Sequence, residues 1–156
     1  METHSKHMLT ALALARKAAQ KDEVPVGAVI VWRGAVIAKA YNLRETKKNP
    51  LVHAEILAIA EAARKLKRWR LSGCTLYVTL EPCPMCAGAI VNARIDTVIF
   101  GAYDPKGGAF GSLYNLAEGR LNHSPSVTGG IMAEESSNLL KQYFKGKRAD
   151  GRNASN

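Results

Sequence analysis

Residues 74–93 read CTLYVTLEPCPMCAGAIVNA, and this stretch decides the fold class. Its first part, Cys74–Leu80, is an apolar run with valine, threonine and tyrosine, which is typical of a buried strand. Its last part, Pro84–Ala93, begins with a proline, which suits the first position of a helix, and continues with helix-forming alanines. The stretch therefore predicts a strand that leads into a helix, with two cysteines, Cys83 and Cys86, at the junction.

On both sides of this stretch, the spacing of apolar residues predicts further helices and strands. Helices are predicted at Lys6–Lys21, His53–Leu66 and Ala133–Lys147, and strands at Val24–Trp32, Ala35–Tyr41, Thr97–Gly101 and Ser126–Ile131. Arg33-Gly34 separates the first two strands and indicates a hairpin turn. After this hairpin the strands alternate with helices, a pattern typical of an α/β sandwich that carries helices on both faces of one sheet.

The chain of 156 residues is long enough for one domain with its own core. We assign residues 1–148 to that domain and expect residues 149–156 to form a polar, disordered tail. His4 and His7 are expected to lie in a mobile start. In the last predicted helix, the inward side is expected to carry Leu139, Leu140, Tyr143 and Phe144.

Composition describes a globular chain with a strong positive charge. Apolar residues make up 47% of the sequence, the formal net charge is +9 and the isoelectric point is about 9.7. The polar start and the lack of a long apolar run predict a cytoplasmic protein with no membrane partner. The charge favours a polyanionic partner, first of all a nucleic acid, although a merely soluble basic protein would have the same composition.

The cysteine pair has three conceivable uses: a thioredoxin-type redox pair, half of a structural zinc knot, or part of a catalytic metal site. A structural knot needs a second pair of ligands. The only other cysteine, Cys74, lies in an apolar strand, where we expect it to be a small buried hydrophobic residue. Three cysteines in an unsecreted chain also argue against a disulfide framework.

His53 and Glu55 distinguish between these uses. His53 begins a predicted helix, as Cys83 does, and helix N-termini favour the thiolate form that binds metal. One histidine and two cysteines make three protein ligands, whereas a structural zinc site normally has four and a catalytic site leaves the fourth position to water. Glu55 is not needed as a ligand and is placed to move the proton of that water. We therefore predict a catalytic centre with one Zn²⁺ per chain.

At these residues the sequence resembles the zinc-dependent nucleobase deaminases, whose signature is H-x-E followed by P-C-x-x-C. It is similar in particular to the bacterial tRNA-specific adenosine deaminases over residues 8–148, including EVPVGA (23–28), VHAE (52–55) and LYVTLEPCPMCAG (76–88). The resemblance implies a cytidine deaminase-like fold, a three-layer α/β/α sandwich with a five-stranded mixed sheet, and a homodimer. It also implies hydrolysis of adenosine to inosine at the wobble position of a tRNA anticodon, with the anticodon stem-loop as the RNA partner.

The resemblance assigns roles to particular residues of this sequence. His53, Cys83 and Cys86 match the zinc ligands, and Glu55 matches the proton shuttle. The other matching positions are Asn42 for contact with the target nucleoside, Val24 and Pro25 for the pocket wall, and Asp104, Lys106, Asn122 and Arg148 for segments near the anticodon loop. The chain departs from the family pattern at Ser124-Pro125-Ser126 and at Gly146, which is expected to weaken the last helix.

Three other functions remain to be weighed against this one. A deaminase of a free base or nucleoside, such as guanine, cytosine or cytidine, would share the metal chemistry, but a small uncharged substrate gives no reason for a strongly basic surface. A non-enzymatic RNA-binding module with structural zinc would leave Glu55 unused. A redox protein built on the cysteine pair would leave both His53 and Glu55 unexplained.

Overall fold

A five-stranded sheet forms the middle of the molecule in the computed structural model, which describes the backbone of residues 2–154 and the side chains of residues 2–149. The strands are β1 (Gly27–Trp32), β2 (Ala35–Tyr41), β3 (Cys74–Leu80), β4 (Thr97–Ala102) and β5 (Ser126–Thr128). The helices are α1 (Glu2–Gln20), α2 (Ala54–Leu66), α3 (Pro84–Ala93) and α4 (Ala133–Ala154).

The sheet is mixed, with the strand order β2-β1-β3-β4-β5. β1 pairs antiparallel with β2 and with β3, whereas β3 with β4 and β4 with β5 are parallel. The parallel pairing of β3 with β4 follows because α3 carries the chain back between them, so both strands end at the same side of the sheet. The predicted α/β fold with a five-stranded mixed sheet is therefore confirmed.

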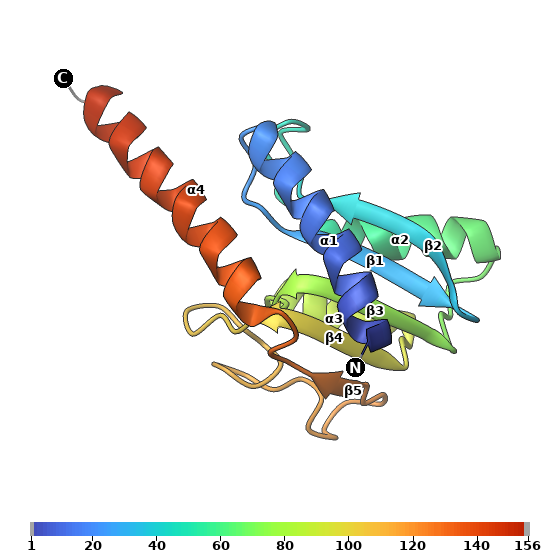
Figure 1. The fold of residues 1–156 in the computed structure, drawn as a ribbon. Coiled ribbons are helices and arrows are strands. Elements are labelled where there is room, and N and C mark those ends of the chain that lie inside the picture. The colour runs from blue at the N-terminus through green and yellow to red at the C-terminus, as the bar shows by residue number, and fades with distance from the viewer. Residues whose placement is uncertain (1, 155–156) are drawn as a thin grey trace.

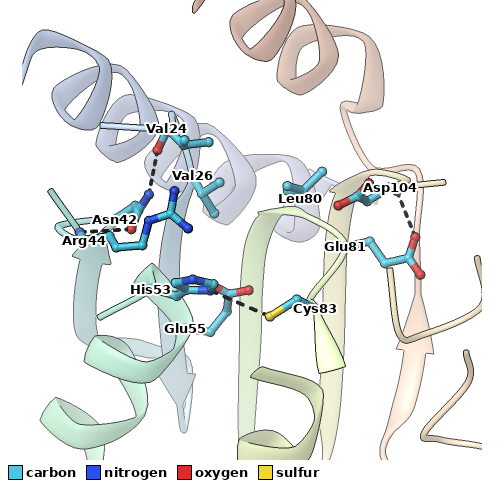
Figure 2. A pocket seen from close by; sticks show the side chains of 10 residues that line it. All are labelled: Val24, Val26, Asn42, Arg44, His53, Glu55, Leu80, Glu81, Cys83 and Asp104. Carbon is cyan, nitrogen blue, oxygen red and sulfur yellow. Dashed lines mark hydrogen bonds between the residues drawn. The ribbon is translucent and has the colours of Figure 1, made fainter. Parts of the chain in front are cut away.

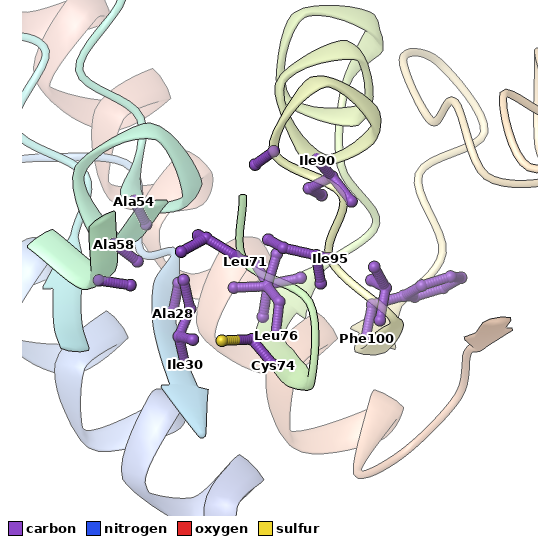
Figure 3. Packing of buried hydrophobic residues seen from close by; sticks show 14 of the residues in the cluster. Ala28, Ile30, Ala54, Ala58, Leu71, Cys74, Leu76, Ile90, Ile95 and Phe100 are labelled. Carbon is purple, nitrogen blue, oxygen red and sulfur yellow. The ribbon is translucent and has the colours of Figure 1, made fainter. Parts of the chain in front are cut away.

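Helices cover both faces of the sheet, which makes the three layers (Figure 1). Alternate residues of β1 point to opposite faces: Ala28 and Ile30 pack with α2 and α3, and Val29 packs with α1. Figure 3 shows the first of these clusters, in which Ala54 and Ala58 of α2 lie near Ala28 and Ile30 of β1, while Phe100 lies at the other end of the cluster. Cys74 is fully buried in this cluster, as predicted.

Helix α1 lies unusually close to β1 because Gly27 has no side chain. A Cβ atom at Gly27 would overlap the backbone carbonyl oxygen of Ala11 in the helix. We expect Gly27→Ala to lower the free energy of unfolding by about 1–3 kcal/mol, since neither backbone can yield without moving the helix. Chemical denaturation measures this, with Gly88→Ala as the control because a Cβ at Gly88 meets open space. Equal effects of the two substitutions would contradict the close approach.

Several predicted boundaries were wrong. α1 begins at Glu2, and it places His4 and His7 against Tyr77 of β3, so neither histidine lies in a mobile start. β5 stops at Thr128, where two glycines follow. The reason in both cases is packing. His7, on the buried side of α1, is only 5% exposed. Gly129 lies against the ring of Phe100, where no side chain fits.

The last helix also differs from its prediction. α4 continues to Ala154, so the predicted helix end at Lys147 was wrong. The predicted disorder of the tail from residue 149 stays a prediction, and residues 155 and 156 lie outside the described residues. Gly146 does not end the helix, because one exposed glycine costs only about 1 kcal/mol. Leu139, Leu140 and Tyr143 are partly buried, but Phe144 is 44% exposed rather than inward.

Among the helices of residues 2–154, none combines the length and the apolar character that crossing a bilayer requires.

Candidate functional site

Two helix N-termini meet at one edge of the sheet. His53 is the N-cap residue of α2 and Cys83 is the N-cap residue of α3, and both have extended backbone conformations. Neither side chain caps its own helix by a hydrogen bond, so both remain available to other groups. Pro84 occupies the start of α3, which places Cys86 one turn beyond Cys83 on the same side of the helix.

This arrangement brings the three predicted ligands together. The Nδ1 atom of His53 lies 3.7 Å from the sulfur of Cys83 and 3.5 Å from the sulfur of Cys86. All three potential ligand atoms lie within 4.8 Å of one another, so the group could hold a metal ion. Cys74, the remaining cysteine, does not belong to this group.

Hydrogen bonds link the three side chains and shift their pKa values. A hydrogen bond from the Cys86 thiol lowers the pKa of Cys83 to about 4, although burial opposes this. The same bond raises the pKa of Cys86, and a hydrogen bond to Cys83 raises the pKa of His53. These hydrogen bonds favour the thiolate form of Cys83, which is the form that binds metal.

Glu55 lies in the first turn of α2 and is only 4% exposed. Burial raises its pKa to about 7, and the negative charge of the Cys83 thiolate adds to this effect. A carboxyl with a pKa near neutrality both accepts and releases protons readily, which suits a general acid–base.

A cavity of about 150 Å³ opens beside these groups (Figure 2). Its lining comprises Val24, Val26, Asn42, Arg44, His53, Glu55, Leu80, Glu81, Cys83 and Asp104. The structure thus brings the predicted residues Val24, Asn42 and Asp104 to the candidate metal group. Pro25 is buried and does not belong to the lining. The amide group of Asn42 is held in place, since it donates to the Val24 carbonyl and accepts from the Arg44 backbone N–H.

Four lining residues were missed by the sequence analysis: Val26, Arg44, Leu80 and Glu81. Val26 and Leu80 lie within predicted strands and looked like core residues. Arg44 was one cation among many in a polar loop. The signal that was available for Glu81 is its place next to the proline of the cysteine motif, directly after a buried strand.

A larger groove of about 710 Å³ adjoins the cavity and shares Val24, Leu80 and Asp104 with it. Its other lining residues are Tyr103, Lys106, Leu140, Phe144, Lys147 and Arg148. Helix α4 forms one side of this groove and is attached to the end of α1 through Asp22, which pairs with Lys147 and accepts a hydrogen bond from Tyr143. The predicted residues Lys106 and Arg148 therefore lie in the groove rather than in the cavity.

Asn122 is the one predicted residue that the chain does not bring to this edge of the sheet. It is exposed and precedes β5, and its neighbour His123 bonds to the carbonyl of Ile95, just before β4 begins. β4 and β5 are parallel, so Asn122 lies at the side of the sheet where these two strands begin. The cavity lies at the opposite side, where β3 and β4 end.

Comparison with known proteins groups the chain with deaminases. The family model of the MafB19-like deaminases matches residues 2–148. A tRNA-specific adenosine deaminase of Bacillus subtilis is 53% identical over 140 residues, which cover 89% of this chain and 87% of that protein. One from Aquifex aeolicus is 51% identical over 136 residues, covering 86% of this chain and 89% of the relative.

Solved structures agree with these relatives. One, from a study of A-to-I editing by tRNA A34 deaminases at the wobble position, has a TM-score of 0.84 and 45% identity, covering 86% of this chain and 99% of its own. A guanine deaminase from Nitrosomonas europaea has a TM-score of 0.79 at only 26% identity, with 89% and 83% of the two chains covered. The fold is thus common to several deaminases, while the higher identities are to proteins that act on tRNA.

Proposed function

The chain belongs to the family of the tRNA-specific adenosine deaminases, and on that premise we propose that it hydrolyses adenosine to inosine at the wobble position, position 34, of a tRNA anticodon. The observation that carries this proposal is the continuity of a small cavity with a larger basic groove. The cavity contains a buried carboxyl beside a His/Cys/Cys group, and the groove is lined by Lys106, Lys147 and Arg148. The cavity suits a single base, and the groove suits the phosphates of its neighbours.

We propose that the metal is zinc, with one ion per chain held by His53, Cys83 and Cys86. In a tetrahedral site with bonds of about 2.3 Å to sulfur and about 2.1 Å to nitrogen, the nitrogen and sulfur atoms lie about 3.6 Å apart. The distances of 3.7 and 3.5 Å from His53 Nδ1 to the two sulfurs fit this value. When bound, zinc acts as a Lewis acid on a water molecule and so supplies the nucleophile for C6 of adenine.

The residues of the chain would bind the base and move its protons. Asn42 would hold the nucleoside, since its amide group is already oriented in the cavity wall. The Glu55 carboxylate would take one proton from the water and pass it to the ring nitrogen N1. It would then carry the remaining proton of the oxygen added at C6 to the amino group, so that the C6–N bond breaks and ammonia leaves. Adenosine and water thus give inosine and ammonia, and the buried position of Glu55 keeps bulk water from the transferred protons.

An anticodon loop is a suitable substrate because its bases are already unpaired and cost little to turn outward. Phe144 and Tyr103, 44% and 57% exposed at the groove, offer aromatic faces to such bases. A homodimer is supported by Leu113, Tyr114 and Leu121, which are exposed apolar side chains that line one surface depression outside the groove. We also place the reaction in the cytoplasm, where tRNA is used.

The substrate class is tested by offering the purified protein RNA and free compounds side by side. Inosine is expected in a transcribed tRNA with adenosine at position 34 and in its isolated anticodon stem-loop, but free adenosine, cytidine and guanine should not react. The rate at limiting RNA should fall by at least about tenfold between about 50 and 200 mM salt, because several phosphates are contacted. A tRNA with guanosine at the wobble position is the control. Deamination of guanine or cytidine without reaction of tRNA would establish the free-base alternative instead.

A further inference from the structure

Two glutamates outside the proposed chemistry are among the most buried large side chains of the described residues. Glu23 is 0% exposed and Glu81 is 2% exposed. Carboxylates are rarely so completely buried, because removing the charge from water is costly unless several donors replace it. Neither takes part in an ion pair of the described residues. The donors that replace water must therefore be hydrogen-bond donors, and their origin identifies what each glutamate does.

Glu23 accepts its hydrogen bonds from one loop only, the loop that joins β2 to α2. One carboxylate oxygen accepts from the backbone N–H of Glu45 at 2.9 Å, and the other accepts from both the backbone N–H and the hydroxyl of Thr46. These bonds outweigh burial and hold the pKa of Glu23 below its ordinary value, so it stays ionised at neutral pH. The same loop carries Asn42 and Arg44, which line the cavity.

Glu81 does the same for the loop that follows β4. Its Oε1 atom accepts from the backbone N–H of Asp104 at 3.0 Å and from the Ser112 hydroxyl, and its Oε2 atom accepts from the backbone N–H groups of Phe110 and Ser112, each at 3.1 Å. Gly108 lies directly against the carboxyl group, where a Cβ atom would overlap it. One side chain thus binds three separated points of a loop of nine residues, 104–112.

The two loops lie on opposite sides of the candidate metal group. Figure 2 shows Asn42 and Arg44 on one side of His53 and Cys83, and Asp104 with Glu81 on the other. The two loops also line different spaces. Asn42 and Arg44 line the cavity but not the groove, whereas Asp104 lines both and Lys106 lines the groove. A buried charge is weak evidence of stabilisation, since a well-packed apolar side chain often stabilises a core as well. Holding a loop in one conformation is a function that an apolar side chain lacks.

We propose that Glu23 and Glu81 are positioning residues that each fix one wall of the substrate site through hydrogen bonds to a single loop. Glu23 fixes the wall that contacts the reacting nucleoside, and Glu81 fixes the wall that extends from the cavity into the groove. The assignment of what each wall binds rests on the proposed function, whereas the holding of the loops does not.

Limited trypsin digestion of the folded protein tests the holding of the loops without reference to activity. The Glu23 loop contains the cleavage sites Arg44, Lys47 and Lys48, and the Glu81 loop contains Lys106. Glu23→Gln should speed cleavage in the first loop by about tenfold or more and leave the Lys106 site unchanged, because a charged acceptor contributes about 1.5–3 kcal/mol. Glu81→Gln should do the reverse, so each variant is the control for the other. Equal acceleration at both loops, or none at either, would overturn the proposal.

A milder matched pair covers the case in which a glutamine variant does not fold. Thr46→Val removes the hydroxyl that donates to Glu23, and Ser112→Ala removes the hydroxyl that donates to Glu81. Each is expected to speed cleavage in its own loop by a few-fold, since one hydrogen bond contributes about 1 kcal/mol. Uniform cleavage rates across this pair would likewise contradict the two separate attachments.

Kinetics on an anticodon stem-loop tests the division between the walls. Glu81→Gln should raise KM for the RNA about tenfold with a smaller change in kcat, and Glu23→Gln should lower kcat about tenfold with a smaller change in KM. Metal content of both variants should equal that of the parent, which separates positioning from damage to the ligands. If the parent protein does not act on RNA, the proposed function fails while the digestion result stands. If the RNA reacts but the two variants show the same KM and kcat changes, the assignment of the walls fails.

Discussion

Glu55→Gln is expected to retain the metal and to lose deamination by roughly 10³-fold or more. Glutamine has the shape of glutamate but does not carry a proton between the water, the ring and the leaving ammonia. The substitution should leave the metal group intact, because Glu55 is not one of its three residues. Glu55 is 4% exposed and lies beside that group. Single-turnover formation of inosine in an anticodon stem-loop measures the loss, and elemental analysis measures the metal.

Glu61→Gln is the matched control for this experiment. Glu61 lies on the same helix, α2, but at the surface, where it pairs with Arg64 and Lys65. Its replacement should change the rate by less than twofold, since Glu61 does not line the cavity and surface ion pairs contribute little to stability. A Glu55→Gln protein that turns over at nearly the parent rate would show that another group moves the proton. Loss of the metal from that variant would show instead that Glu55 supports the ligands.

The second large effect is expected from Cys86→Ser, which should lower both the metal content and the rate of deamination by more than about tenfold. Removing a sulfur ligand costs more than the 10–100-fold typical of groups that only support a ligand. Cys74→Ser is the matched control, because Cys74 and Cys86 are both 0% exposed and differ only in their neighbours. Cys74 lies in the apolar cluster under α2, and its replacement should reduce stability by about 1–3 kcal/mol while the metal stays bound. Metal analysis together with thermal unfolding separates the two results.

Either of two outcomes would contradict this assignment. Metal retained in the Cys86→Ser protein would remove Cys86 from the ligand set. Metal lost from a folded Cys74→Ser protein would add Cys74 to it, and the site would then have four protein ligands, as structural zinc sites do.

The two cysteines of the candidate metal group could be predicted because their spacing is local, whereas their meeting with His53, 30 residues before Cys83, depends on the fold. Cys83 and Cys86 are one helical turn apart, and both Cys83 and His53 stand where a helix begins, so spacing and helix starts alone indicate that the side chains are free. The burial of Glu55 could not be predicted from its spacing to His53, and burial is what raises its pKa to about 7. The cysteine in the strand was predicted correctly for the same local reason, since its neighbours in the sequence are apolar.

The outer parts of the site depend on segments that are far apart in the sequence. Asn122 was grouped with Lys106 and Arg148, but the parallel pairing of β4 and β5 places it at the opposite edge of the sheet. Arg44 belongs to no motif, and its position in the cavity wall depends on the loop between β2 and α2, whereas Glu81 directly precedes the cysteine motif. The periodicity of apolar residues within one segment does not predict at which side of the sheet a later loop will lie.

The sequence by itself predicted the order of helices and strands from local patterns, and it pointed to His53, Cys83 and Cys86 as a candidate metal group and to Glu55 as a proposed proton shuttle. The tertiary structure alone decided how the substrate site is enclosed. Residue 23 meets residues 45 and 46, and residue 81 meets residues 104, 110 and 112, only after the chain has folded. A buried carboxylate needs donors from whichever segment lies beside it, and that neighbour is a property of the packed sheet and its loops rather than of any stretch of sequence.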